Sequence, residues 1–240
     1  MDSEDYLYML ESAKEHLEEI DKMYYECLKL DYVPKKLTNK IRYFLTDIES
    51  ALDYISYIVF NKYCLPKLCE NKAPSEKIER LKKQVNFPLF DQEEWFNKKM
   101  KKAFPYLDET KPEIIATFEK YQVYNTSKDY WLPIFNRLVN NNKHRELEKQ
   151  SKEMTAQVNY FRDDNGNVFQ DVYTDTHGII IDGKPLATKV LNSTRDDTVA
   201  NIKVNFFFKE MRKPVMPTLK MIYTEANIVI DEFKIIIEGD

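Results

Sequence analysis

The run TAQVNYFRDDNGNVFQDVYT, residues 155–174, decides the fold of this chain of 240 residues. Polar and apolar residues alternate along 155–162 and again along 168–174, which is the period of strands with one buried face. The five residues between them, Asp-Asp-Asn-Gly-Asn, favour a turn, because asparagine and glycine tolerate left-handed backbone angles. The run therefore predicts a β-hairpin.

Further short apolar runs follow this hairpin. They predict strands at 178–181, 186–191 and 202–208, with a turn at Asp182 and Gly183 after the first of them. Together with the hairpin, these runs predict one antiparallel sheet of about four strands.

The chain before the hairpin lacks glycine, since all 4 glycines lie at residue 166 or beyond, and this absence favours helices. Apolar residues at helical spacing along 6–27 and 39–61 predict two long helices that pack as an antiparallel pair. The same spacing along 219–233 predicts a C-terminal helix. The predicted fold is α+β: a mainly helical bundle at 1–150, an antiparallel β segment at 151–213 and a helix at 214–240 that packs back on the body.

Composition limits the classes of function. The formal net charge of -4 gives no general attraction for nucleic acid, so RNA binding would need a local basic patch. The acidic start of the chain and the lack of an apolar run near about 20 residues predict no secretory signal, no membrane partner and a cytoplasmic location. Cys27, Cys64 and Cys69 have neither redox-pair nor zinc-ligand spacing and are expected to be buried free thiols.

The densest candidate for chemistry is the run RLVNNNKHR, residues 137–145, which gathers three cations around one of the chain's 3 histidines. On an unbroken helix Arg137 and His144 share a face, about 10.5 Å apart along the axis. The three asparagines are weak helix formers and predict a bend before Lys143, which would bring the pair closer. A guanidinium holds phosphate in a fork geometry and an imidazole moves protons at neutral pH, so the pair suits phosphate chemistry.

Other side chains would support this pair. They are Asn141, Lys143, Arg145 and Asp53. Asp53 shares one edge of the second predicted helix with Arg42 and Glu49, at steps of four and seven, and this edge would meet the Arg137 region. Two interpretations are open for it: an internal ion pair, or the orientation of His144.

An arginine followed seven residues later by a histidine, near the end of a late helix in a helical body, resembles the HEPN superfamily. The pattern of residues 131–147, which ends in Asn-Lys-His-Arg-Glu-Leu, is similar to a group of uncharacterised bacterial HEPN-like proteins. The 42–52 stretch and the pair Phe87-Pro88 belong to the same pattern, so the resemblance covers about residues 38–148.

For active members, the resemblance implies metal-independent RNA cleavage in a homodimeric cleft, with Arg137 and His144 as the motif residues. Leu138 departs from the family pattern, because active members commonly have a polar residue directly after the motif arginine. Two other interpretations of the pair therefore stay open. One is ligand binding without catalysis, and the other is a structural role, since basic residues near a helix C-terminus favour its dipole.

Neither His16 nor His177 has metal-ligand spacing to another histidine or cysteine, and the chain has no GxGxxG, P-loop or nucleophile-elbow pattern. No metal or cofactor is therefore expected. The leading hypothesis is an HEPN-like protein of bacterial or phage origin, concerned with RNA or with defence against foreign genetic elements, with RNA and a second copy of the chain as partners. The competing hypothesis is a non-enzymatic interaction protein, in which the helical body dimerises and the strand segment or last helix binds a partner of unknown identity.

Overall fold

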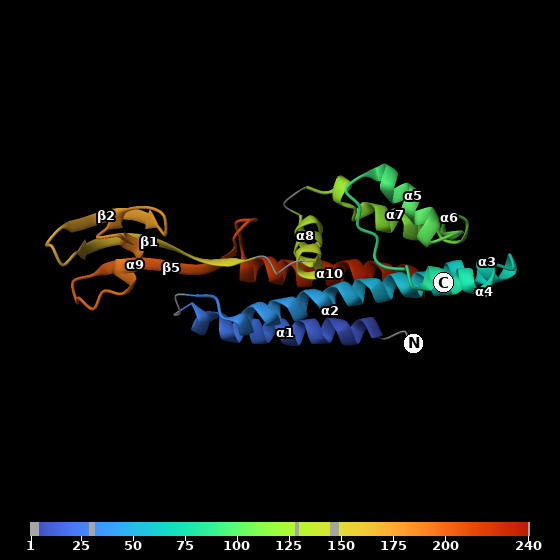
Figure 1. The fold of residues 1–240 in the computed structure, drawn as a ribbon, viewed down its shortest axis with the longest axis horizontal. Helices are drawn as coiled ribbons and strands as arrows, with labels where there is room; N and C mark the ends of the chain where they lie inside the picture. Colours follow the sequence, from blue (N-terminus) through green and yellow to red (C-terminus); the bar gives the residue numbers. More distant parts are fainter. Residues whose placement is uncertain (1–4, 29–31, 128–129, 145–148, 240) are drawn as a thin grey trace. The chain divides into compact units, whose positions relative to one another are not determined.

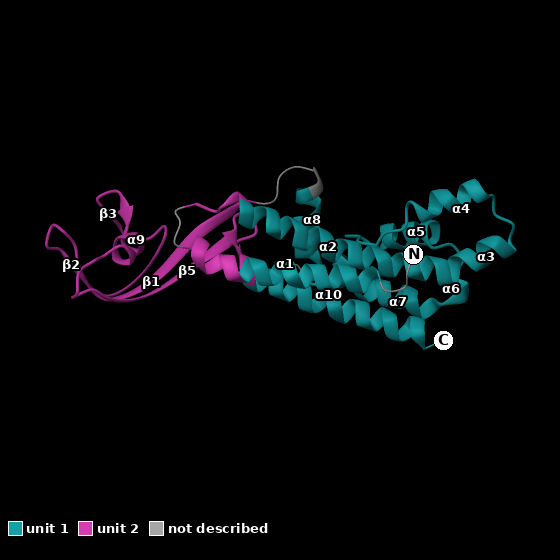
Figure 2. Cartoon of the chain, turned by 90° about the horizontal axis from the view of Figure 1, so that it is seen from below, with its two compact units in different colours: residues 1–21, 36–147, 217–240 teal, residues 22–35, 148–216 magenta. Residues whose placement is uncertain are grey.

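The computed structural model of the protein describes residues 5–28, 32–127, 130–144 and 149–239. It has the predicted α+β fold, mainly helical with a small antiparallel sheet (Figure 1). Two compact units divide the chain (Figure 2). The helical unit consists of residues 1–21, 36–147 and 217–240, and the sheet unit consists of residues 22–35 and 148–216.

Two long helices, α1 (Asp5–Cys27) and α2 (Lys35–Val59), lie side by side in the helical unit. Ser12 donates a hydrogen bond to Asp47 at 2.7 Å, and Lys40 forms an ion pair with Glu19. Residue numbers therefore rise along one helix as they fall along the other, which confirms the predicted antiparallel pair. The seam is apolar because buried residues of α2, from Leu37 onward, recur at helical spacing.

Short helical elements follow α2. They are η1 (Phe60–Cys64, a π-helix), α3 (Leu65–Glu70), α4 (Ser75–Lys82), α5 (Glu93–Ala103), α6 (Leu107–Thr110), α7 (Pro112–Lys120) and η2 (Val123–Asn125, a 3₁₀ helix). Turns between them use non-glycine residues with left-handed backbone angles, Lys72 at φ 51° and Tyr106 at φ 66°. This strained choice follows from the absence of glycine in this part of the chain.

Helix α8 (Trp131–His144) continues without interruption through its three asparagines, so the predicted bend before Lys143 is wrong. Leu138 and Val139 are buried on its inner side and keep the helix packed. The Asn140 side chain donates to Asn136 Oδ1 at 2.9 Å instead of competing for the helix backbone. Packing therefore outweighs the weak intrinsic helix propensity of asparagine.

Helix α10 (Val215–Glu238) completes the core of the helical unit, as predicted for the C-terminal helix. The Phe233 ring is fully buried, with its centroid 4.6 Å from that of Phe118 and 6.0 Å from that of Phe87. Beside it, Glu232 accepts hydrogen bonds from Lys120 and Tyr121. These contacts join α10 to α7 and to the extended chain between α4 and α5.

The sheet unit contains the predicted hairpin, with Ala156 paired to Thr174 and Phe161 to Phe169. Its main antiparallel sheet has the strand order β2-β1-β5-β6. Those strands are β1 (Gln150–Arg162), β2 (Val168–Asp175), β5 (Val199–Phe208) and β6 (Lys213–Pro214). A separate two-stranded ladder pairs β3 (Ile180–Ile181) with β4 (Lys184–Pro185), so the predicted strand at 178–181 does not join the main sheet.

The predicted strand at 186–191 is wrong, because these residues form the helix α9 (Leu186–Leu191). Its buried residues are Leu186, Ala187 and Val190. Val190 follows the other two by four and three residues, which places all three on one side of a helix. They pack on one face of the sheet, against Met154, Ala156, Val158 and Phe161. A sheet face rich in apolar side chains needs such a cover.

The cysteine prediction holds in part. All three cysteines are free, and Cys27 and Cys64 are buried, but Cys69 is exposed. Burial raises the pKa of the Cys64 thiol to about 12, so this thiol is unreactive at neutral pH. Cys69 is the last but one residue of the short helix α3, whose buried residue is Leu68.

Candidate functional site

Arg137 lies on the exposed side of α8, opposite the side that buries Leu138 and Val139. Because α8 is continuous, position 144 follows Arg137 by two turns on the same side, about 10.5 Å along the helix axis. The shared helix face agrees with the spacing argument, although without the expected bend the two positions keep their full helical separation.

The other predicted site residues are distributed as follows. Asn141 is half-buried in the same helix, and Asp53 is half-buried in α2. The side chains of Lys143 and His144, and the whole of Arg145, lie outside the described residues. The described geometry of the site therefore rests on Arg137, on Asp53 and on the backbone of α8.

A cavity of about 200 Å³ joins α2 to α8 in the helical unit, and we call it the α8 cavity. Its lining residues are Glu49, Leu52, Asp53, Asn86, Phe87, Pro88, Leu89, Phe90, Phe135 and Asn140. The predicted meeting of the Glu49 and Asp53 edge with α8 takes place here, at Asn140, one turn from Arg137. Arg42 is exposed on α2 and is not among the lining residues.

Asp53 has a role that the sequence did not reveal. Its Oδ1 accepts a hydrogen bond from the backbone N–H of Phe87 at 2.7 Å, a short bond of the charge-assisted kind. Asp53 thereby anchors the chain that forms one wall of the α8 cavity. The Phe87-Pro88 pair was the available signal, because proline favours an extended residue before it, whose N–H then needs a partner outside regular structure.

Gln122 anchors the same wall from the other side and was not identified from the sequence. This fully buried amide donates to the carbonyl oxygens of Pro88 at 2.9 Å and Phe118 at 2.7 Å. Its Oε1 accepts the backbone N–H of Phe90 at 2.9 Å. A buried amide with these three partners is well satisfied, so it holds the segment 86–90 in one conformation.

The charges around α8 decide where an anion can bind. Glu49 and Asp53 contribute carboxylates to the α8 cavity, and these repel a phosphate inside it. Arg137, one turn along α8 from Asn140, is exposed. The guanidinium of Arg137, rather than the α8 cavity, therefore suits a phosphate.

The two other histidines, His16 and His177, contact residues away from α8. His16 lies 3.6 Å from Asp47 Oδ2 and against the Tyr43 ring, with centroids 5.7 Å apart. His177 lies in a turn, where its backbone N–H donates to Asp175 at 2.8 Å. Within the described ranges, no group of three or more His, Cys, Asp or Glu side chains could hold a metal ion. In those same ranges, no helix has the length and apolar character that crossing a bilayer requires.

In comparisons with known proteins, the chain matches no protein-family model, no curated protein and no solved structure. The HEPN resemblance therefore stays a prediction that rests on residues 38–148. The features that bear on function are the exposed Arg137, the unbroken α8 and the wall held by Asp53 and Gln122.

Proposed function

We propose that the protein is an HEPN-like, metal-independent ribonuclease that acts through Arg137 and His144, in a bacterial or phage system directed at foreign genetic elements. One observation carries the proposal. Helix α8 runs unbroken from Trp131 to His144, which keeps positions 137 and 144 on the side of the helix where Arg137 is exposed. This arrangement suits an anion contacted by a guanidinium and an imidazole together.

The proposed chemistry uses the 2′-hydroxyl of RNA as the nucleophile. Its oxygen attacks the adjacent phosphorus while an imidazole accepts its proton, and the bond to the 5′-oxygen breaks as that oxygen takes up a proton. The products are a 2′,3′-cyclic phosphate and a 5′-hydroxyl. Arg137 stabilises the negative charge that grows on the phosphate oxygens in the transition state.

A second copy of the chain completes this scheme. One neutral imidazole can accept the proton, but another, protonated group must donate to the leaving oxygen in the same step. Two copies of His144 in a dimeric cleft supply both roles. A mass measurement by size-exclusion chromatography with light scattering should therefore show a dimer, and a strict monomer would remove the two-chain cleft.

The direct test is incubation of the purified protein with mixed RNA in EDTA. We expect cleavage by the native chain and a loss of about 100-fold or more in His144→Ala and in Arg137→Ala. His177→Ala and Arg195→Ala are matched controls, since both residues are exposed in the sheet unit, and they should cleave normally. Cleavage by a folded His144→Ala protein at the native rate would overturn the assignment.

A second function, a non-enzymatic interaction protein, is favoured by the exposed side of α10. Ile228 is 49% exposed and Ile235 is 72% exposed, and their spacing of seven places them on one side of the helix, as in a helix pair. The partner that fits this spacing is the same helix of a second copy. If this function holds, Ile235→Ser dissociates the dimer, the Ile180→Ser control does not, and the native protein cleaves no RNA.

A further inference from the structure

A second cavity in the helical unit, of about 420 Å³, lies between α5 and the chain that precedes it, and we call it the α5 cavity. Its lining residues are Gln84, Asn86, Pro88, Phe90, Lys99, Met100, Lys102, Ala103 and Phe104. Two lysines and two amides supply its polar groups, and the other side chains are apolar or aromatic. None of these lining residues carries a carboxylate.

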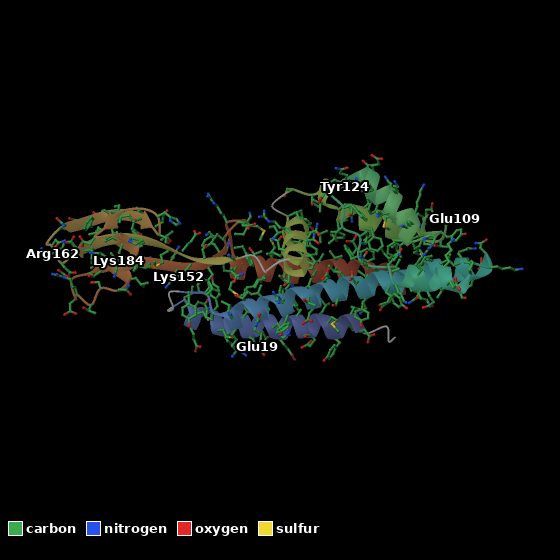
Figure 3. All side chains as sticks on the ribbon, viewed as in Figure 1. Glu19, Glu109, Tyr124, Lys152, Arg162 and Lys184 are labelled. Carbon is green, nitrogen blue, oxygen red and sulfur yellow. The ribbon has the colours of Figure 1, made fainter. Side chains whose placement is uncertain are left out.

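The sequence of α5 explains why lysines border this cavity. Phe96 and Met100, four residues apart, are the buried residues that fix the inner side of the helix. Phe96 packs against Tyr124, with ring centroids 6.2 Å apart, and Tyr124 is labelled in Figure 3. Lys99 and Lys102 flank this buried side and are exposed, so their ammonium groups stand at the edge of the cavity.

The two lysines differ from others in the same unit. Lys67 pairs with Glu70 at 2.8 Å, and Lys82 pairs with Glu79 at 3.0 Å. Neither Lys99 nor Lys102 forms an ion pair with a carboxylate in the part of the chain that the structure describes. Their charges are therefore available to an anionic ligand.

A cavity of about 530 Å³ in the sheet unit shows the contrasting case. Its charged lining residues are four cations, Arg162, Lys184, Lys189 and Arg195, and three carboxylates, Asp163, Asp164 and Asp182. Arg162 and Lys184 are labelled in Figure 3. The three carboxylates offset most of the positive charge there, so this cavity has a weaker preference for an anion than one lined by cations without carboxylates. Among the two, the α5 cavity is the one whose charge selects a negatively charged ligand.

The chemistry of the α5 cavity fits a nucleotide. Lys99 and Lys102 suit a phosphate, and the apolar surface of Phe90 and Met100 suits the face of a base. Asn86 adds an amide that can donate to and accept from a base edge. The volume of the α5 cavity is in the range of ordinary small-molecule sites.

The α5 cavity is also joined to the α8 cavity by a common wall. Asn86, Pro88 and Phe90 line both cavities, so the two cavities share one extended segment as a wall. Figure 1 shows this segment, between α4 and α5, passing between α8 and α5. Asp53 and Gln122 hold the segment in place, which fixes the spacing of the two cavities.

We infer that the α5 cavity binds one nucleotide of a single-stranded RNA, with Lys99 and Lys102 holding the phosphate of that nucleotide. The inference rests on the proposed function and adds a substrate subsite to it. Lys99 and Lys102 are binding residues in this scheme and do not touch the cleaved bond.

The test measures binding separately from cleavage, with the full-length His144→Ala protein and a fluorescein-labelled single-stranded RNA of ten nucleotides. Adding Lys99→Ala and Lys102→Ala should weaken binding about 10-fold at low salt and reduce the slope of log K against log salt by about 0.7 to 1.4. Lys98→Ala with Lys101→Ala is the matched control, because it removes the same charge from α5 outside the cavity. Equal weakening in both double variants, or none in either, overturns the inference.

Further arms separate the two proposals and the two sources of a nucleotide. Cleavage by the native protein with unchanged RNA binding in the Lys99→Ala, Lys102→Ala variant overturns the subsite alone. Selective loss of binding in that variant, with no cleavage by the native protein, overturns the nuclease and leaves the subsite. Uridine and adenosine monophosphates, titrated in place of RNA, should bind far more weakly than RNA, and equal affinity would assign the cavity to a free nucleotide instead.

Discussion

Asp53 shows what one carboxylate contributes to the wall of a site. Its Oδ1 is the partner of the Phe87 N–H, and the Phe87 ring is itself buried against the rings of Phe118 and Phe233. Removing the acceptor leaves a buried donor unsatisfied. The segment that lines the two cavities then loses this anchor and keeps the hydrogen bonds with Gln122.

Asp53→Ala should therefore lower the free energy of unfolding by about 1–3 kcal/mol, the cost of an unsatisfied buried donor. Asp53→Asn keeps an acceptor oxygen and should lose less. Urea denaturation followed by circular dichroism measures both. Asp231→Ala, an exposed aspartate of α10, is the control and should change stability by less than about 0.5 kcal/mol. Equal stabilities of Asp53→Ala and the control would remove the anchoring role.

Glu232 makes stability depend on pH in the acid range. Burial opposes its ionisation, but hydrogen bonds from Lys120 and Tyr121 outweigh that effect and lower its pKa. The carboxylate is therefore more acidic in the folded than in the unfolded chain. Its contribution is present above the unfolded pKa of about 4.3 and is lost as pH falls through the lower folded value.

Glu232→Gln should remove this part of the acid sensitivity. The melting temperatures of the native chain and the variant are measured between about pH 3 and pH 7. They should converge at the acid end, because protonated Glu232 no longer contributes to stability. Glu225→Gln is the control, because it makes the same substitution on the same helix. A difference in melting temperature that stays constant across the range would contradict the assignment.

At the scale of elements, the helix α9 and the sheet that it covers depend on each other. Leu186 is fully buried against the sheet, whereas Leu191 of the same helix is 40% exposed. Leu186→Ala should destabilise the sheet unit by about 2–5 kcal/mol through lost burial and a residual cavity. Leu191→Ala, the matched control, should cost much less. Hydrogen exchange of the β1 and β5 amides compares the two, and equal protection in both variants would contradict the packing described.

Local pattern predicted those elements that have one clear period. The hairpin and the long helices belong to this group. The run 186–191 was misassigned because its short apolar pattern suits a strand or a helix, and the uncovered sheet face decides between them. The bend expected at the asparagines of α8 is absent for a related reason. Burial of Leu138 and Val139 outweighs the weak helix propensity of asparagine.

The candidate site was predictable only where it depends on helix geometry. Spacing alone places Arg137 and position 144 on one side of α8. The cavities were not predictable, because their common wall is held by hydrogen bonds between distant residues, from Asp53 to Phe87 and from Gln122 to Pro88, each spanning 34 positions. Periodicity within one element contains no information about such contacts.

At the scale of the whole molecule, each compact unit is made of segments that are separated in sequence. The helical unit needs residues 217–240, and Phe233 is the best measure of that need because its ring is fully buried. Phe233→Ala should cost about 3–5 kcal/mol in the free energy of unfolding. Ile235→Ala, 72% exposed on the same helix, should have little effect. Urea denaturation of both variants checks this, and similar midpoints would show that α10 is dispensable.

The late position of α10 has a consequence for synthesis on the ribosome. At about 5–20 residues per second, the interval between residues 147 and 233 lasts on the order of ten seconds. During that time Phe87 and Phe118 have been made but lack their aromatic partner. The strands of the sheet unit, β1 to β6, are all translated before Phe233. The helical unit, which contains the first residues of the chain, is therefore the last to be completed, and nascent protein exposes its aromatic core to chaperones and proteases until translation has passed α10.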